Sequence, residues 1–131
     1  MKTDRLIAVG KALAYAIVVL GIIHDIATFT PLVQSGLSCV SPADLHAIIY
    51  MSLMCGTSLI LSGIILIMIL KKIEEFRFMN SIAIAIGTFL GLSGIASVVF
   101  MFDNPFAWLS LVLNLSMFGI TLGLKRNFGK S

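Results

Sequence analysis

The sequence predicts an all-α protein: an antiparallel bundle of four transmembrane helices with both termini in the cytoplasm. Of its 131 residues, 59% are apolar and only 11% are charged, a composition that suits a chain solvated by lipid. The nine basic residues precede or open the first of four apolar stretches, lie between the second and third, or follow the fourth. Cytoplasmic ends and loops are enriched in Lys and Arg, so this asymmetry predicts four transmembrane helices with both termini in the cytoplasm. We expect a multi-pass protein of the inner (plasma) membrane.

The lengths of the four apolar stretches predict four membrane-spanning helices. A hydrocarbon layer of about 30 Å needs roughly 20 apolar residues per helix. The first stretch is also too long for the apolar part of a signal peptide, and we expect it to be retained. The predicted helices form one domain, residues 1–131, and span residues 6–29, 42–70, 79–102 and 105–124.

Capping patterns define two of the helix starts. The sequence Ser-Pro-Ala-Asp at 41–44 combines an N-cap hydroxyl, a proline at the first helical position and an acid in the first turn. The sequence Asp-Asn-Pro at 103–105 repeats this pattern. A tight turn there should make the last two helices antiparallel neighbours.

The ionisable side chains suggest one candidate site, on the side away from the basic residues. That side has no Lys or Arg, but it has three aspartates and both histidines. Because the first two helices should run antiparallel, their ends should bring several of these groups together. The candidate outer-face cluster consists of His24, Asp25, Asp44, His46 and Asp103.

Imidazole and carboxylate groups are ligands that a divalent metal such as zinc accepts. However, His24 and Asp25 are adjacent, so on a helix they point about 100° apart and do not easily serve one ion. Asp44 has a simpler role in stabilising a helix N-terminus. We therefore expect no cofactor, with a metal as the alternative. An ionisable pair such as His24 and Asp25 inside a membrane helix usually faces the protein interior or a wet cavity.

One strongly polar side chain lies deep in a predicted helix. Asn114 is near the middle of the fourth helix, with Ser110 and Thr121 near the same face. Such an amide usually hydrogen-bonds to a neighbouring helix. A contact with a substrate or a quinone is the alternative.

Stripes of small residues indicate close helix packing, because they let two backbones approach where lipid removes the hydrophobic driving force. Whether the stripe of the third helix packs within the chain or against a second copy stays open. The stripes consist of Gly10, Ala14 and Gly21, of Ser52, Gly56 and Gly63, and of Ala83, Gly87, Gly91 and Gly94.

Other signatures narrow the possible functions. The basic flanks should attract anionic lipid headgroups, and nothing indicates a nucleic-acid partner. Cys39 and Cys55 form no Cys-x-x-Cys motif, which excludes the dithiol chemistry of quinone-coupled thiol oxidoreductases. No acid lies deep in any helix, which argues against a small proton-coupled multidrug exporter.

The first half of the chain resembles small bacterial four-helix integral membrane proteins, many of them uncharacterised, a grouping that includes DoxX-like proteins. The resemblance rests on the sequence Gly-Ile-Ile-His at 21–24, on Pro31 and on His46. The resemblance implies a bacterial membrane protein and no particular activity. It also favours a functional role for His24.

Three functional classes follow. The first is a non-catalytic accessory or assembly subunit, with the bilayer and either a larger membrane protein or further copies of itself as partners. The second is an oligomeric transporter or channel for a small solute. The third is an outer-face metal or redox site that uses His24 and His46.

Overall fold

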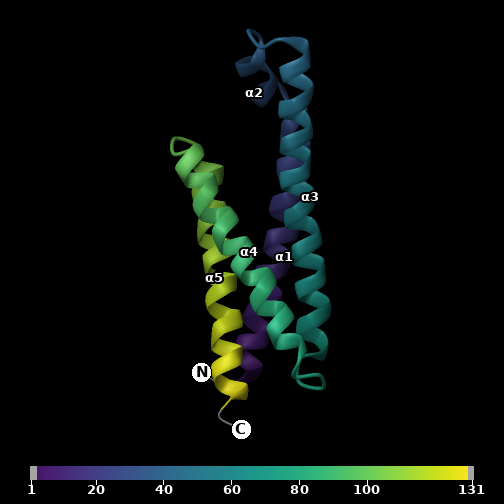
Figure 1. Ribbon diagram of the computed structural model, residues 1–131, viewed down its shortest axis with the longest axis vertical. Coiled ribbons are helices and arrows are strands. Elements are labelled where there is room, and N and C mark those ends of the chain that lie inside the picture. Colours follow the sequence, from purple (N-terminus) through teal and green to yellow (C-terminus); the bar gives the residue numbers. More distant parts are fainter. Residues whose placement is uncertain (1–2, 130–131) are drawn as a thin grey trace.

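Four long helices make up the protein, in a computed structural model that describes residues 3–129 (Figure 1). Each is long and apolar enough to cross a membrane. In chain order the elements are α1 (Thr3–Thr28), the short α2 (Pro31–Gln34), a 3-10 turn (Ser35–Leu37), α3 (Pro42–Lys72), α4 (Met79–Phe100) and α5 (Pro105–Phe128). The predicted all-α antiparallel bundle is confirmed, and each predicted helix end lies within four residues of the observed one.

The caps explain why two predicted starts are correct. Ser41 is the N-cap of α3, where its hydroxyl accepts a hydrogen bond from the Asp44 backbone N–H at 3.2 Å. Asn104 is the N-cap of α5, and its side chain accepts from the Phe106 N–H at 2.9 Å. The Trp108 indole N–H donates to the Phe102 carbonyl at 2.8 Å, which ties the α4–α5 turn to the first turn of α5.

The bundle consists of two closely packed pairs, α1 with α3 and α4 with α5, and α1 also packs along α5. Glycines bring the pairs together. A Cβ built on Gly21 would lie 2.7 Å from the Gly56 carbonyl oxygen, and one built on Gly63 would lie 2.8 Å from the Ala14 carbonyl oxygen. These close approaches fix the register of α1 against α3.

The stripe on α4 packs within the chain. A Cβ on Gly87 would lie 2.7 Å from the Thr121 hydroxyl, and one on Gly94 would lie 3.0 Å from the Leu111 Cα. The face of α4 that carries these glycines is therefore its contact with α5. The buried core between the four helices includes Ile17, Leu66, Leu90 and Met117.

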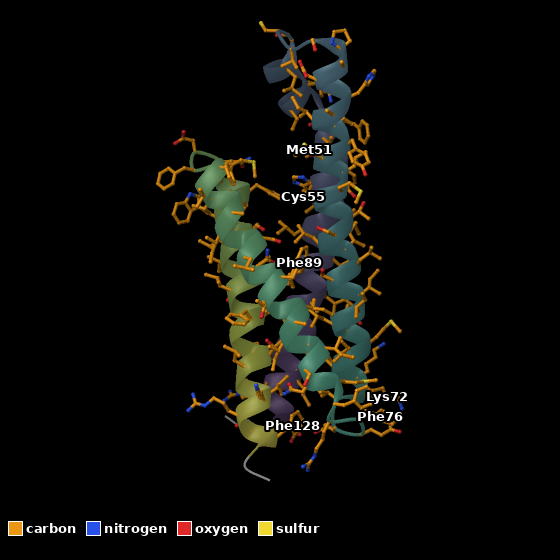
Figure 2. All side chains as sticks on the ribbon, viewed as in Figure 1. Met51, Cys55, Lys72, Phe76, Phe89 and Phe128 are labelled. Atoms are coloured by element: carbon orange, nitrogen blue, oxygen red, sulfur yellow. The ribbon has the colours of Figure 1, made fainter. Side chains whose placement is uncertain are left out.

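The two ends of the bundle differ. One end carries the described termini and the α3–α4 turn, with Lys72, Phe76 and Phe128 (Figure 2). Seven of the nine basic residues belong to helices or turns at this end, while Lys2 and Lys130 lie outside the described residues. The other end, which we call the distal end, carries α2 and the α4–α5 turn. There α1 and α3 extend beyond the α4–α5 turn (Figure 1).

Candidate functional site

The imidazole of His24 lies where α1, α3 and α5 meet at the distal end. Its Nε2 is 3.2 Å from the Ser52 hydroxyl of α3. Its ring is tilted against the Phe106 ring of α5, with centroids 5.1 Å apart. This one half-buried side chain therefore links three helices.

Hydrogen bonds around His24 close into a ring of three residues, which we call the hydroxyl ring: His24, Thr28 and Ser52. The Thr28 hydroxyl donates to the His24 carbonyl oxygen at 3.0 Å, which uses its single proton. Ser52 must then donate to Thr28 across their 2.7 Å contact. With its own proton used, Ser52 can only accept from His24 Nε2. A neutral His24 therefore carries its proton on Nε2, and its Nδ1 is left as an acceptor.

A cavity of about 140 Å³ lies beside the hydroxyl ring. Its wall combines the ring with apolar side chains and the cap of α5, and is made up of His24, Ala27, Thr28, Val33, Ser52, Asn104 and Phe106. The Gln34 side-chain amide donates to the Thr28 carbonyl oxygen at 2.7 Å, so α2 is held against the end of α1 beside this cavity.

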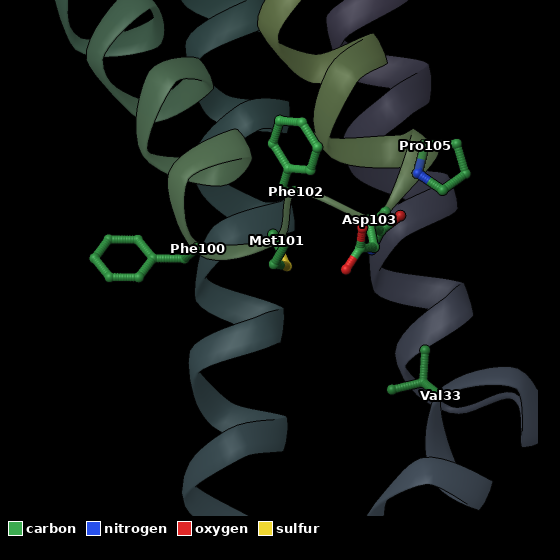
Figure 3. A pocket seen from close by; sticks show the side chains of 7 residues that line it. Val33, Phe100, Met101, Phe102, Asp103 and Pro105 are labelled. Carbon is green, nitrogen blue, oxygen red and sulfur yellow. The ribbon is translucent and has the colours of Figure 1, made fainter.

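A larger and shallower hollow of about 610 Å³ lies next to it, between α2 and the α4–α5 turn. Val33 of α2 borders it on one side, and Met101 and Asp103 border it on the other (Figure 3). Val33 and Asn104 line both spaces, so the small cavity and this hollow adjoin each other.

Asp25 lies in the contact between α1 and α3 and is not one of the residues that line the cavity. Its Oδ1 lies against Gly56, where a Cβ would overlap it, and this atom is buried with no hydrogen-bond partner among residues 3–129. Its Oδ2 accepts a long bond of 3.5 Å from the Thr57 hydroxyl. His24 and Asp25 thus occupy different environments, as their adjacent positions on a helix require.

The distal end does not unite the five predicted site residues. Asp44 accepts a 2.6 Å hydrogen bond from Ser41 as part of the α3 cap. His46 is exposed and lies six residues before Ser52, about 9 Å further along the axis of α3. Asp103 is exposed in the α4–α5 turn. Within the described part of the chain, no three His, Cys, Asp or Glu side chains are placed to hold a metal ion.

The separation has a physical cause. Between Thr28 and Pro42 the chain forms α2 and a 3-10 turn, which carry it past the end of α1. Helix α3 therefore begins ten residues, or about 15 Å, beyond the level at which Ser52 meets His24. The start of α3 and the end of α1 therefore lie at different levels, which separates Asp44 and His46 from His24.

Asn114 is fully buried in α5, at 0% exposure. Its amide nitrogen donates to the Ser110 hydroxyl of the same helix at 3.2 Å. Its Oδ1 has no hydrogen-bond partner in the region that the structure describes. The predicted bond to another helix is therefore not observed there, and the side chain instead packs against Gly94 of α4.

The sequence interpretation treated Ser52 only as a small packing residue and gave Thr28 no role. The register of the glycines could have revealed both. If Gly21 opposes Gly56, then Ser52, one turn before Gly56, faces the α1 segment that follows Gly21 and contains His24 and Thr28.

Comparison with known proteins adds no family: no protein-family model, curated protein or solved structure matches this chain.

Proposed function

We propose that the protein is a small, non-catalytic subunit of a larger assembly in the bacterial inner membrane, with both termini in the cytoplasm. The observation that carries this proposal is the distal segment of α3, residues 42–51, which is apolar and extends past the part of the bundle that the bilayer can cover.

Two independent observations support a membrane boundary near Ser52. Counting about 20 hydrocarbon-spanning residues back from Lys72 along α3 reaches Ser52. Tryptophan prefers the level of the lipid headgroups. Trp108 follows Phe106 by two residues, and Phe106 contacts His24, which in turn contacts Ser52. Trp108 therefore lies near the level of Ser52. The 31 residues of α3 span about 46 Å, well beyond the hydrocarbon thickness.

The segment beyond this boundary has several exposed apolar side chains. Ile48, Tyr50 and Met51 are exposed, and Met51 is 70% exposed. Large exposed apolar patches outside the bilayer are typical of protein interaction sites. A subunit that docks another membrane protein at its outer surface accounts for this segment.

The interior of the bundle supports a packing role over a transport role. The deepest amide, Asn114, is enclosed rather than exposed to a polar path. Glycine contacts close the α1–α3 and α4–α5 interfaces along their length. The basic residues at the other end would hold that end among anionic headgroups on the cytoplasmic side.

A pair of methionines on one helix offers a matched test. Met51 is 70% exposed and Met68 is 64% exposed, and only Met51 lies beyond the proposed boundary. A photo-crosslinking amino acid is placed at each position in turn, and adducts are analysed from native membranes. We expect a single protein partner at position 51 and lipid adducts at position 68. Lipid adducts alone at both positions would contradict the proposal.

A further inference from the structure

We propose that the cavity beside His24 binds a neutral hydroxyl compound whose apolar body is about the size of one aromatic ring. The inference goes beyond the proposed subunit role and does not depend on it. It rests on the hydrogen-bonding groups that the cavity leaves unused, on its volume and on the charges around it.

The first group is the acceptor on His24. The hydroxyl ring fixes the proton of neutral His24 on Nε2, which leaves Nδ1 with a free lone pair. No residue of the described chain donates to Nδ1. Because His24 lines the cavity, we infer that its Nδ1 can accept a hydrogen bond from a ligand there.

The second group is the amide of Asn104. Its Oδ1 already caps α5 by accepting from the Phe106 N–H at 2.9 Å. Its amide nitrogen has two protons and no acceptor within the described residues. A hydroxyl group can donate to His24 and accept from Asn104 at the same time, whereas a carbonyl or an ether can only accept.

The volume and the apolar lining of the cavity determine the size of the apolar group that a ligand can place there. The cavity measures about 140 Å³, and an engineered cavity of about 150 Å³ in another protein holds benzene. Ala27, Val33 and the Phe106 ring supply apolar walls. One ring-sized apolar group fits, and the adjoining hollow leaves room for a substituent that extends outwards.

The charges at the distal end select a neutral ligand. Asp25 and Asp103 flank this region, Asp44 lies further along α3, and all Lys and Arg residues of the described chain belong to the opposite half. No Lys or Arg of the described chain is near enough to pair with an anion, so a phenol or alcohol is favoured over a carboxylate or a phosphate.

Binding of phenol, toluene and benzoate to the full chain in lipid nanodiscs tests the proposal, with affinities from saturation-transfer NMR. Phenol should bind about tenfold more tightly than toluene, the effect of one well-made hydrogen bond, and benzoate should not bind. In His24→Gln the new amide can still donate to Ser52 but places no acceptor at the Nδ1 position. We expect this variant to bind phenol about tenfold more weakly, to bind toluene as before, and to unfold at an unchanged temperature.

A pair of alanine substitutions supplies the control. Ala27→Leu fills the cavity and should abolish the binding of both phenol and toluene, while Ala85→Leu on the exposed side of α4 should leave both unchanged. Absence of phenol binding, equal affinity for phenol and toluene, or phenol binding that survives both His24→Gln and Ala27→Leu would overturn the proposal. Displacement of phenol by 4-octylphenol would indicate a lipid-borne hydroxyl, and its exclusion would indicate a free small molecule.

Discussion

Ser52 holds two bonds of the hydroxyl ring, because it accepts from His24 and donates to Thr28. Replacing Ser52 with alanine removes both bonds between α1 and α3. Interhelical hydrogen bonds in membranes contribute about 0.6 kcal/mol on average and about 1.7 kcal/mol at most. We expect Ser52→Ala to lower the free energy of unfolding by about 1 kcal/mol in a detergent titration.

Ser58 provides the matched control on the same helix. Its hydroxyl donates to the Cys55 carbonyl of its own helix at 2.7 Å, so Ser58→Ala should leave stability nearly unchanged. Equal effects of the two substitutions would show that the hydroxyl ring does not hold the helices together.

Asn114 is a buried polar residue whose side-chain oxygen accepts no hydrogen bond within the described chain. Because its Oδ1 is buried without a partner in the described chain, replacement by leucine of similar size removes a desolvation cost. We expect Asn114→Leu to be neutral or stabilising in the same titration. If Asn114 bonded to another helix as the sequence suggested, this variant would be destabilised. A clear loss of stability would therefore contradict the structural interpretation.

At the scale of the helices, Gly56 is the tightest point of the α1–α3 interface. A Cβ there would overlap the Asp25 carboxylate and lie 2.9 Å from the Gly21 carbonyl oxygen of α1. Since a backbone oxygen cannot rotate aside, α1 must shift. Overpacking of this kind costs roughly 1–3 kcal/mol, and we expect that loss in thermal or detergent unfolding of Gly56→Ala.

Gly119→Ala is the corresponding control on α5. Nothing lies within 4 Å of a Cβ at Gly119, so this substitution should be neutral or should stabilise the helix through propensity. Comparable destabilisation in both variants would mean that the glycine contacts do not set the spacing of α1 and α3.

The helices were predictable because their signals are local. Apolar length sets each span, and the caps at Ser41 and Asn104 set two starts to the residue. The stagger of α1 and α3 was not predictable in the same way, because it depends on α2, whose four residues are held by a bond from Gln34 to Thr28. The five candidate residues are spread along the distal end for this reason. His24 could be singled out from its place in the sequence, but its partner Ser52 follows only from the helix register.

At the scale of the whole molecule, the two free cysteines allow the orientation to be measured. Cys39 lies exposed in the distal connection, and Cys55 is exposed on α3. In a Cys55→Ser background, we expect a membrane-impermeant maleimide to label Cys39 in intact cells, because the proposed topology places the distal end outside the cytoplasm.

The control for orientation is a cysteine at position 75 in the α3–α4 turn, in a chain without Cys39 and Cys55. The turn lies at the end that carries the basic residues, so this cysteine should react only after the cells are permeabilised. The reversed pattern, with position 75 labelled in intact cells and Cys39 protected, would invert the topology.

The subunit role is the central claim for the whole molecule, and native mass spectrometry of complexes released from their own membranes at native abundance tests it most directly. The proposal predicts that this 14.1 kDa chain is found in fixed stoichiometry with a larger membrane protein. It also predicts that shortening α3 by its distal apolar segment releases the chain from that complex. A chain found alone, or only with copies of itself and lipid, would contradict the claim.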